Sequence, residues 1–429
     1  MQGTDGRAVR GADVRETDVC VVGAGPAGLA LTLMLLRSGV RTTLVERATS
    51  FRRDFHGEIL QPGGQRVLDD LGVLAPARRR GSRALDGFQV VQGERLLLDI
   101  DYRRLAAPYD HLLALPQPFL LGELQGACRL LPGFTYLEGH RLASLVEKRP
   151  GAPVTGVVTR GPDHTPTEVR ARVVVGADGR YSKTRALAGI AAGRSEAFAQ
   201  DAVWFSLHAP GRQTGRVRVH RAGGGLVLVH ESHPDRLRVG WTLPHGGWRD
   251  VVARGMADVR RELTRAIPQF ADLVHEQLSS PAQLTLLDVF ASHAGDWVRD
   301  GLVLLGDAAH THGPIGGQGV SLALQDAAAL HPVLVDALHA GQVSRERLVP
   351  YQRRRSPVAQ AVHRMQRVQA GAMFGRGDGP LADFARTRAA AALSRTPVGA
   401  RIARRVAHGT DPLGVRTDLF TARAAAANV

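Results

Sequence analysis

The stretch of sequence that decides the fold runs from Asp18 to Glu46, DVCVVGAGPAGLALTLMLLRSGVRTTLVE. An apolar run leads into three glycines, a helix-like run follows, and a second apolar run closes the unit. The glycines have the spacing G-x-G-x-x-G and are Gly23, Gly25 and Gly28. This order predicts a strand, a tight turn, a helix and a second strand, the unit that binds a dinucleotide.

Each part of this unit has a physical task. The first glycine permits the turn, the second lets the backbone approach a pyrophosphate, and the third lets the helix pack against the strand. The helix start offers free N–H groups and a positive dipole end to phosphates. Glu46 ends the second strand, where an acid accepts hydrogen bonds from a ribose. The candidate binding residues here are Gly23, Gly25, Pro26, Ala27, Gly28, Glu46 and Arg47.

Two further apolar runs end in glycine turns. Residues 172–185, RVVVGADGRYSKTR, place Asp178 and Gly179 after a predicted strand. Residues 301–327, GLVLLGDAAHTHGPIGGQGVSLALQDA, place Gly306 and Asp307 after another strand, ahead of a glycine-rich helix start that favours negative charge. The candidates in this third segment are Gly306, Asp307, Pro314, Gly316, Gly317, Gln318, Gly319 and Val320.

The segment from about 200 to 292 differs from its flanks. Short strand-like runs, among them DAVWFSLHAP, GLVLVHES and RLRVGWTLP, alternate with turn residues. This pattern predicts an antiparallel sheet inserted into an α/β frame. Residues 86–102 predict a hairpin, and the chain beyond about 344 has Ala and Arg at helical spacing.

Composition limits the class of protein. The 429 residues, 44% of them hydrophobic, suit two or three domains, and no run reaches the roughly 18 apolar residues of a membrane-spanning helix. The first residues lack the apolar core of a secretory signal, so we expect a cytoplasmic protein. Two isolated cysteines predict neither a disulfide framework nor a zinc site, and we expect no bound metal.

The formal net charge is +15. Aromatic residues make up only 5% of the chain and do not alternate with the basic residues, which disfavours nucleic-acid binding. We expect a solvated helical face or a weak membrane-surface contact instead.

The three glycine motifs, in this order, resemble those of the FAD-dependent monooxygenases of the para-hydroxybenzoate hydroxylase type, over about residues 18–335. The resemblance implies that the first motif and Glu46 hold the FAD pyrophosphate and adenosine ribose. It also implies that Asp178 serves FAD and NAD(P)H, that Asp307 holds the ribityl–phosphate side, and that Pro314 and residues 316–319 line the isoalloxazine. Arg52 or Arg53, and Gln117 at a helix start, match further family positions near the cofactor.

Two positions depart from the family pattern. His56-Gly57 stands where an Arg-Gly pair is common, and Ser321 where Asn is frequent. Residues 57–73, GEILQPGGQRVLDDLGV, are similar to a segment of squalene and polyene epoxidases, which favours a lipophilic substrate.

The resemblance implies an α/β fold in which a discontinuous Rossmann-type FAD-binding domain comprises residues 1–84, 110–195 and 293–340. A mostly antiparallel substrate-binding sheet domain takes 85–109 and 196–292, and a helical C-terminal region takes 341–429. We expect a monomer or a homodimer.

The implied activity is hydroxylation or epoxidation of a lipophilic aromatic, polyketide or isoprenoid compound in secondary metabolism. NADPH or NADH visits briefly to reduce bound FAD, and molecular oxygen is the co-substrate. No catalytic side chain is assigned. The alternatives are a flavin-dependent reductase of isoprenoid double bonds and, ranked lower, a non-catalytic flavin- or nucleic-acid-binding protein.

Overall fold

The computed structural model describes residues 13–51, 57–195, 200–222, 225–374 and 396–421. Its first unit is the predicted one: β1 (Asp13–Val22), α1 (Pro26–Arg37) and β2 (Thr42–Glu46). Residues 19–22 of β1 and nearly all of α1 are buried, because this helix is covered on all sides by other elements. The apolar sequence of the opening stretch is therefore explained by its central position.

The main sheet is built around β1. Its order is β19-β20-β11-β1-β2-β8, with the antiparallel strands β10 and β9 continuing from β11. β1, β2, β8, β11 and β20 are parallel to their neighbours in the core of the sheet. The remaining bounds are β8 (Phe134–Glu138), β9 (Arg141–Val146), β10 (Gly156–Arg160), β11 (Pro166–Gly176), β19 (Val298–Arg299) and β20 (Leu302–Leu304).

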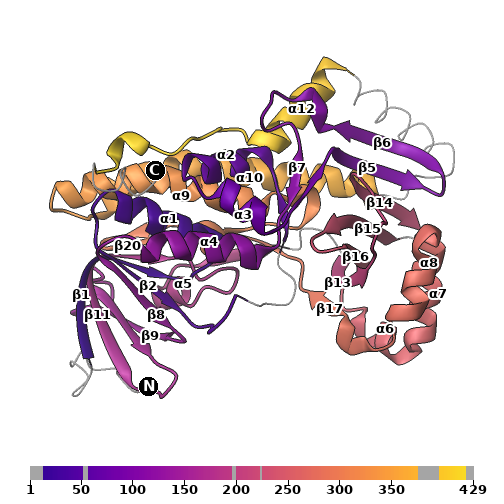
Figure 1. The fold of residues 1–429 in the computed structure, drawn as a ribbon. Helices are drawn as coiled ribbons and strands as arrows, with labels where there is room; N and C mark the ends of the chain where they lie inside the picture. The colour runs from indigo at the N-terminus through magenta and orange to yellow at the C-terminus, as the bar shows by residue number, and fades with distance from the viewer. Residues whose placement is uncertain (1–12, 52–56, 196–199, 223–224, 375–395, 422–429) are drawn as a thin grey trace.

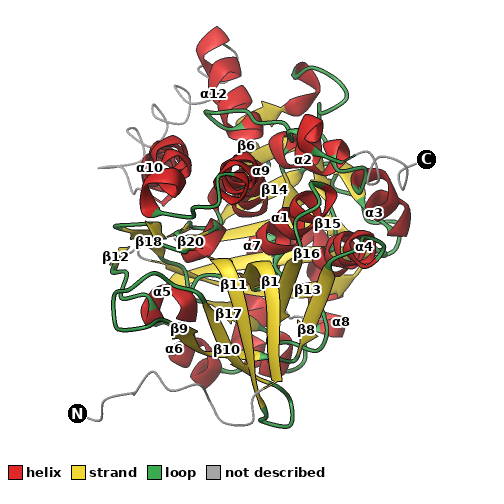
Figure 2. Ribbon diagram, turned by 90° about the vertical axis from the view of Figure 1, so that its left-hand side faces the viewer, coloured by secondary structure: helices red, strands yellow, loops and turns green. Residues whose placement is uncertain are grey.

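Helices cover this sheet. Figure 2 shows α1, α4 (Gln117–Arg129) and α9 (Gly319–His339) on one of its faces. α1 packs against both α4 and α9, and α9 also contacts α2 (Pro62–Asp70) and α10 (Arg345–Phe374). α9 continues through Pro332. The shorter helices are α3 (Leu74–Arg80) and α5 (Lys183–Leu187).

A second sheet lies beside the first (Figure 1). Its order is β17-β13-β16-β15-β14-β5-β6, and every neighbouring pair is antiparallel except β14 with β5. The bounds are β5 (Gly87–Gln92), β6 (Arg95–Asp101), β13 (Gln200–His208), β14 (Val217–Ala222), β15 (Gly225–Ser232), β16 (Arg236–Pro244) and β17 (Thr285–Leu287). The predicted hairpin and inserted, mostly antiparallel sheet are confirmed.

Three helices cover the outer face of this sheet, and the sequence analysis missed them. They are α6 (Trp248–Arg254), α7 (Met256–Ala266) and α8 (Ala271–Gln277). Their apolar side chains and the odd-numbered residues of β13 and β16 form one core, which contains Phe205, Trp241 and Leu243. These three side chains therefore pack under the helices, while Trp204 lies on the opposite face of the sheet across Gly240.

Smaller elements join the two parts. One short sheet has the order β12-β18-β21, and another has the order β3-β7-β4. The bounds are β3 (Ile59–Leu60), β4 (Arg83–Leu85), β7 (Leu112–Ala114), β12 (Ala192–Ser195), β18 (Ala291–Ala294) and β21 (His310–Thr311). The short 3-10 helices are η1 (Tyr102–Arg104), η2 (Pro268–Phe270), η3 (Pro281–Gln283), η4 (Gly306–Ala308), η5 (Ile315–Gly317) and η6 (Thr417–Leu419).

The C-terminal region is helical in α10 and α12 (Pro397–His408), as its sequence predicts. After α12 the chain returns to the first unit, where the Thr421 amide donates to the Arg37 carbonyl over 2.8 Å. Cys20 and Cys128 are free and buried, and burial raises the pKa of each thiol to about 12. In the described parts of the chain, every helix is too short or too polar to cross a bilayer.

Candidate functional site

The three predicted glycine motifs meet at one edge of the main sheet. β1, β11 and β20 are neighbours, with Val22 paired to Gly176 and Gly176 to Leu304, so their carboxyl ends lie together. The chain leaves β1 toward β2 on one side and reaches β11 on the other. Such a switch point in a parallel sheet is where open α/β folds bind ligands.

Gly23 and Gly25 lie in the turn between β1 and α1, and Gly28 lies in the first turn of α1. A Cβ on Gly23 would lie 2.4 Å from the Ala177 carbonyl oxygen, and one on Gly28 would lie 2.0 Å from the Gly23 oxygen. A Cβ on Gly25 would meet nothing within 4 Å. Gly23 and Gly28 are thus required by packing, while Gly25 leaves the space above the turn open.

The start of α1 faces that space. Pro26 occupies the first turn of the helix, and no side chain caps the helix N-terminus. The first-turn N–H groups, including those of Ala27 and Gly28, lie beyond the reach of intrahelical bonds. The site therefore offers uncapped donors and a positive dipole end to an anion.

Glu46 is buried at the end of β2, beside the same turn. Its carboxylate accepts hydrogen bonds from the Ala24 amide at 2.8 Å and the Ala48 amide at 2.9 Å. A carboxylate has about four acceptor positions. Glu46 thus braces the glycine turn from the end of β2, where an acid suits a sugar hydroxyl.

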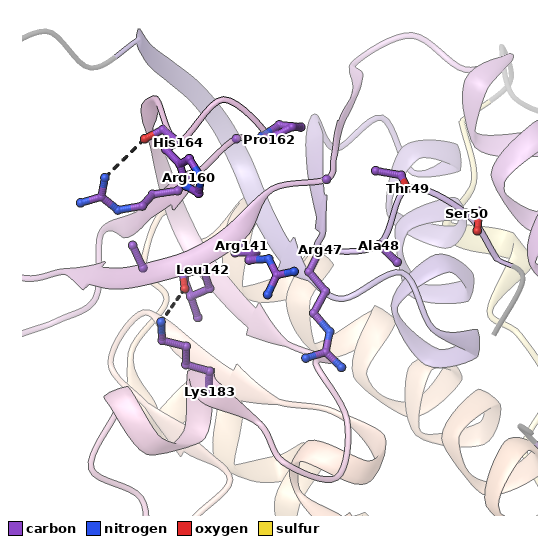
Figure 3. Close-up of a pocket in the computed structure, with 13 residues that line it drawn as sticks. Arg47, Ala48, Thr49, Ser50, Arg141, Leu142, Arg160, Pro162, His164 and Lys183 are labelled. Atoms are coloured by element: carbon purple, nitrogen blue, oxygen red, sulfur yellow. Dashed lines mark hydrogen bonds between the residues drawn. The ribbon is translucent and has the colours of Figure 1, made fainter. Parts of the chain in front are cut away.

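A pocket of about 1000 Å³ begins at Arg47 (Figure 3). Four cationic side chains from separate segments border it: Arg47, Arg141, Arg160 and Lys183. None of the thirteen described residues that line it is acidic. Lys183 donates to the Leu142 carbonyl at 2.8 Å. The pocket is an electropositive hollow directly beyond Glu46.

Asp178 and Gly179 follow β11. The Asp178 carboxylate accepts from the Ser182 hydroxyl at 2.5 Å and from the Thr184 amide and hydroxyl at 2.8 and 3.0 Å. Gly179 has the left-handed backbone that the turn requires, with φ +82°. The contacts of Asp178 hold the start of α5, and its predicted cofactor role remains a prediction.

Gly306 and Asp307 follow β20. Gly306 has φ +59°, and its Cβ position would lie 3.4 Å from Ala323 of α9 and 3.5 Å from Ala27 of α1. The third motif is therefore wedged between the starts of the two helices. No hydrogen bond from the described residues reaches the Asp307 carboxylate, and burial raises its pKa, against the attraction of His310 and Arg180.

The loop from Pro314 to Val320 precedes and opens α9. Gly316 and Gly317 have positive φ, +78° and +58°, and Ile59 packs where a Gly317 side chain would lie. No side chain caps the N-terminus of α9, and a Cβ on Gly319 would meet nothing within 4 Å. Gln318, in contrast, turns its amide to the Val406 carbonyl of α12 at 3.2 Å.

The structure shows a set of hydrogen bonds around Gln61 that the sequence did not indicate. The Gln61 amide donates to the Gly316 carbonyl at 2.5 Å, and its oxygen accepts from the Tyr102 hydroxyl at 3.0 Å. The Gln61 backbone N–H donates to the Ser321 hydroxyl at 2.9 Å. No local pattern gives such contacts, since Gln61 and Gly316 are 255 positions apart.

Other candidates lie at the rim of the site or outside the described residues. Gln117 donates to the Gly57 carbonyl at 3.3 Å. Arg52, Arg53 and His56 fall in 52–56, outside the described residues.

The side of the second sheet opposite α6–α8 faces the first domain. Arg238 of β16 contacts Glu58, 2.7 Å apart, and Ser232 of β15 donates to the other Glu58 oxygen at 2.6 Å. Glu58 directly precedes β3, whose Ile59 contacts the Gly317 turn. The buried His230 of the same sheet face bonds through Nδ1 to the Glu231 carbonyl at 2.8 Å.

This donor set fits FAD. The open turn at Gly25 and the uncapped start of α1 suit a pyrophosphate, and Glu46 suits a ribose. The Asp307 carboxylate, which no hydrogen bond from the described residues reaches, suits hydroxyl groups. The open start of α9 suits the negative charge of a reduced flavin.

Comparison with known proteins agrees with this geometry. The family model described as "FAD binding domain" matches residues 16–366. The 6-methylpretetramide 4-monooxygenase of Streptomyces rimosus is 50% identical over 409 residues, which cover 95% of this chain and 96% of that protein. The protoasukamycin 4-monooxygenase of Streptomyces nodosus subsp. asukaensis is 27% identical, over 82% of this chain and 87% of that one.

Solved structures give the same class. PqsL of P. aeruginosa, in complex with 2-aminobenzoylacetate, has a TM-score of 0.75 at 25% identity. This match covers 89% of the present chain and 100% of the PqsL chain. OxyS anhydrotetracycline hydroxylase of Streptomyces rimosus has a TM-score of 0.72 at 25% identity. This match covers 91% of the present chain and 76% of the OxyS chain.

The fold and the site therefore define an FAD-dependent monooxygenase. The chain belongs to the FAD-binding-domain family, and the resemblance seen in its glycine motifs is confirmed. It uses FAD and molecular oxygen, NAD(P)H is its reductant, and its substrate is a small organic molecule. When bound, FAD supplies the redox and oxygen chemistry, and the protein supplies binding, orientation and exclusion of water.

Proposed function

We propose that this enzyme hydroxylates an aromatic polyketide of the pretetramide type. The observation that carries the proposal is the 50% identity to a 6-methylpretetramide 4-monooxygenase, which extends over almost the full length of both chains. Identity at this level over both chains favours a substrate of the same class. This is narrower than the hydroxylation or epoxidation of any lipophilic compound that the motifs alone favour.

Within this proposal, the residues predicted from the glycine motifs hold FAD. Gly23, Gly25 and Gly28 with the α1 start take the pyrophosphate, and Glu46 takes the adenosine ribose. Asp307 takes the ribityl side. The substrate lies between the second sheet and the turn at Gly316–Gly317.

The same proposal names NADPH rather than NADH as the electron donor. The pocket beyond Glu46 supports it, because the 2′ and 3′ hydroxyls of the FAD ribose, which Glu46 would bind, carry no phosphate, yet four cations border this pocket. NADPH differs from NADH by one ribose phosphate. Charge-assisted hydrogen bonds to that phosphate are stronger than neutral ones.

The substrate is tested with purified holoenzyme, ¹⁸O₂, NADPH and 6-methylpretetramide. We expect faster NADPH oxidation with the substrate and a product that carries one ¹⁸O atom. The control is 2,4-dichlorophenol, named for a 27% identical monooxygenase. Oxygenation of this small phenol but not of the pretetramide would refute the substrate class, and an unlabelled reduced product would favour the double-bond reductase.

The donor is tested with Arg141→Gln. We expect its apparent affinity for NADPH to fall about tenfold while that for NADH is unchanged, since only one ligand carries the extra phosphate. Arg79→Gln, which removes an exposed charge from α3, is the matched control. Equal losses with both donors, or none, would contradict the placement of the phosphate.

A further inference from the structure

The C-terminal helix α10 runs beside the loop that precedes α9. Its residues His363, Gln366 and Gln369 recur every three positions, so they lie on one face of the helix. This face is turned toward residues 311–317, a segment that contains Pro314 and the Gly316–Gly317 turn. A helix of the C-terminal region thus contacts the loop of residues 311–317, which contains residues predicted to line the isoalloxazine.

Gln366 makes the most extensive contact. Its Oε1 accepts from the Gly313 amide at 3.1 Å, and its Nε2 donates to the Gly313 carbonyl at 2.9 Å and to the Ile315 carbonyl at 2.8 Å. The side chain is only 2% exposed. One side-chain amide therefore satisfies three backbone groups of the loop. Because the Gly313 N–H needs an acceptor, the amide oxygen of Gln366 must face it, which fixes the orientation of the amide.

His363 makes a second contact one turn earlier. Its Nε2 lies 2.8 Å from the Thr311 carbonyl oxygen. Because a carbonyl only accepts, Nε2 carries the proton in this contact. The ring also meets His312 edge to face, with 4.2 Å between centroids. Burial lowers the pKa of His363, so the ring is neutral near pH 7.

We propose that Gln366, assisted by His363, is a positioning residue of the flavin site. It fixes the backbone of residues 311–315 from α10 and so determines where Pro314 and the following glycine turn lie. Gly316 and Gly317 have no side chains of their own with which to hold the turn. Helix α10 of the C-terminal region thus contributes to the cofactor site. The sequence alone indicated no function for this helix.

The energetic reason is the burial of backbone groups. Without the Gln366 amide, one N–H and two carbonyls of the loop would need new partners. Buried backbone groups are almost always paired, and an unpaired one is costly. The loop would therefore move or fluctuate rather than keep its place.

The test uses Gln366→Met in the FAD-bound protein. Methionine keeps length and adds no charge, but it cannot form the three hydrogen bonds. The matched control is Gln360→Met, which changes an exposed glutamine on the same helix. Two properties are measured: amide hydrogen exchange in residues 311–317, and the midpoint potential of the bound flavin.

For Gln366→Met we expect exchange in 311–317 to rise about tenfold. We also expect a lower flavin midpoint potential, because the displaced α9 start stabilises reduced flavin less well. Gln360→Met should change neither property. Unchanged exchange and potential in Gln366→Met would overturn the proposal, as would faster exchange throughout the protein, which would indicate a general loss of stability.

If Gln366→Met does not fold, the proposal is tested with two variants of His363 instead. His363→Phe removes the donor to Thr311, whereas His363→Gln retains one. We expect faster loop exchange with phenylalanine and near-normal exchange with glutamine. Wild-type exchange in both variants would overturn the proposal. None of these measurements uses a substrate, so their outcome is independent of the pretetramide assignment.

Discussion

Replacement of Asp307 by asparagine should have opposite effects on the protein without FAD and on its affinity for FAD. Asp307 follows Gly306, which lies between α1 and α9 just after β20, and no hydrogen bond from the described residues reaches the Asp307 carboxylate. Burial raises its pKa above the ordinary 3.8. The ionised group is thus held where the fold alone does not stabilise it.

The direction of each effect follows from that position. Above the folded-state pKa the folded apoprotein bears the full cost of ionising Asp307, and below pH 3.8 that cost is absent. At pH 7, Asp307→Asn should therefore raise the melting temperature of the apoprotein. Loss of one hydrogen bond between a carboxylate and a cofactor hydroxyl costs about 1.5–3 kcal/mol, so the Kd for FAD should increase by roughly 10-fold to 100-fold.

The assays are thermal melting of apoprotein and flavin fluorescence titration at pH 7. Asp178→Asn is the matched control, since its carboxylate already accepts three hydrogen bonds from Ser182 and Thr184. It should lower the apoprotein melting temperature through loss of about 1–3 kcal/mol. A destabilised Asp307→Asn apoprotein with unchanged FAD affinity would refute the reasoning for Asp307.

Three further predictions concern the packing around the site. Gly28→Ala should yield no folded protein, because the added Cβ would lie 2.0 Å from the Gly23 oxygen, whereas Gly25→Ala should fold but retain little FAD. Circular dichroism measures folding, and flavin content measures FAD binding. Equal behaviour of the two variants would contradict these expectations. Asp326→Asn should cost about 3–5 kcal/mol in urea unfolding, because the buried Arg355 guanidinium loses the carboxylate 2.6 Å away and keeps only that of Asp411, 3.6 Å away. A loss below about 1 kcal/mol would argue against this reasoning. Burial lowers the pKa of His331 from 6.5 to about 4, so its contribution to stability is complete above pH 6.5 and decreases toward pH 4; His331→Gln should reduce this dependence in urea midpoints measured at several pH values, and an unaltered pH profile would count against it.

The parts that sequence predicted are those with local causes. Gly23 has a positive φ, +110°, and a Cβ on Gly28 would meet the Gly23 oxygen, so both glycine requirements arise within the turn. β1, α1 and β2 also follow one another directly. Glu46 and Asp307 lie at strand ends that an apolar run identifies. A pattern of short range is sufficient for such features.

The parts that sequence missed have distant or sparse causes. Each of α6–α8 buries only one to three side chains, so its apolar spacing is weaker than that of the neighbouring strands. These side chains are Val251, Val259, Leu263, Ala266, Leu273 and Val274. Gln366 meets Gly313 across 53 positions, which no local pattern reveals. Asp178 was predicted from its place at a strand end, and its contacts with Ser182 and Thr184 at the next helix start were not part of that pattern.

The strand order of the main sheet has a consequence for biosynthesis. β1 is synthesised among the first residues, its neighbour β11 ends at residue 176, and β20 follows only at residues 302–304. On the ribosome, the edge of β11 at residues 174–176 therefore stays unpaired while strands β13–β17 of the second sheet emerge. Unpaired strand edges of this kind are prone to aggregation in nascent chains. Cofactor capture is consequently a late event, and a chain released before residue 302 would present an unfinished sheet to chaperones and proteases.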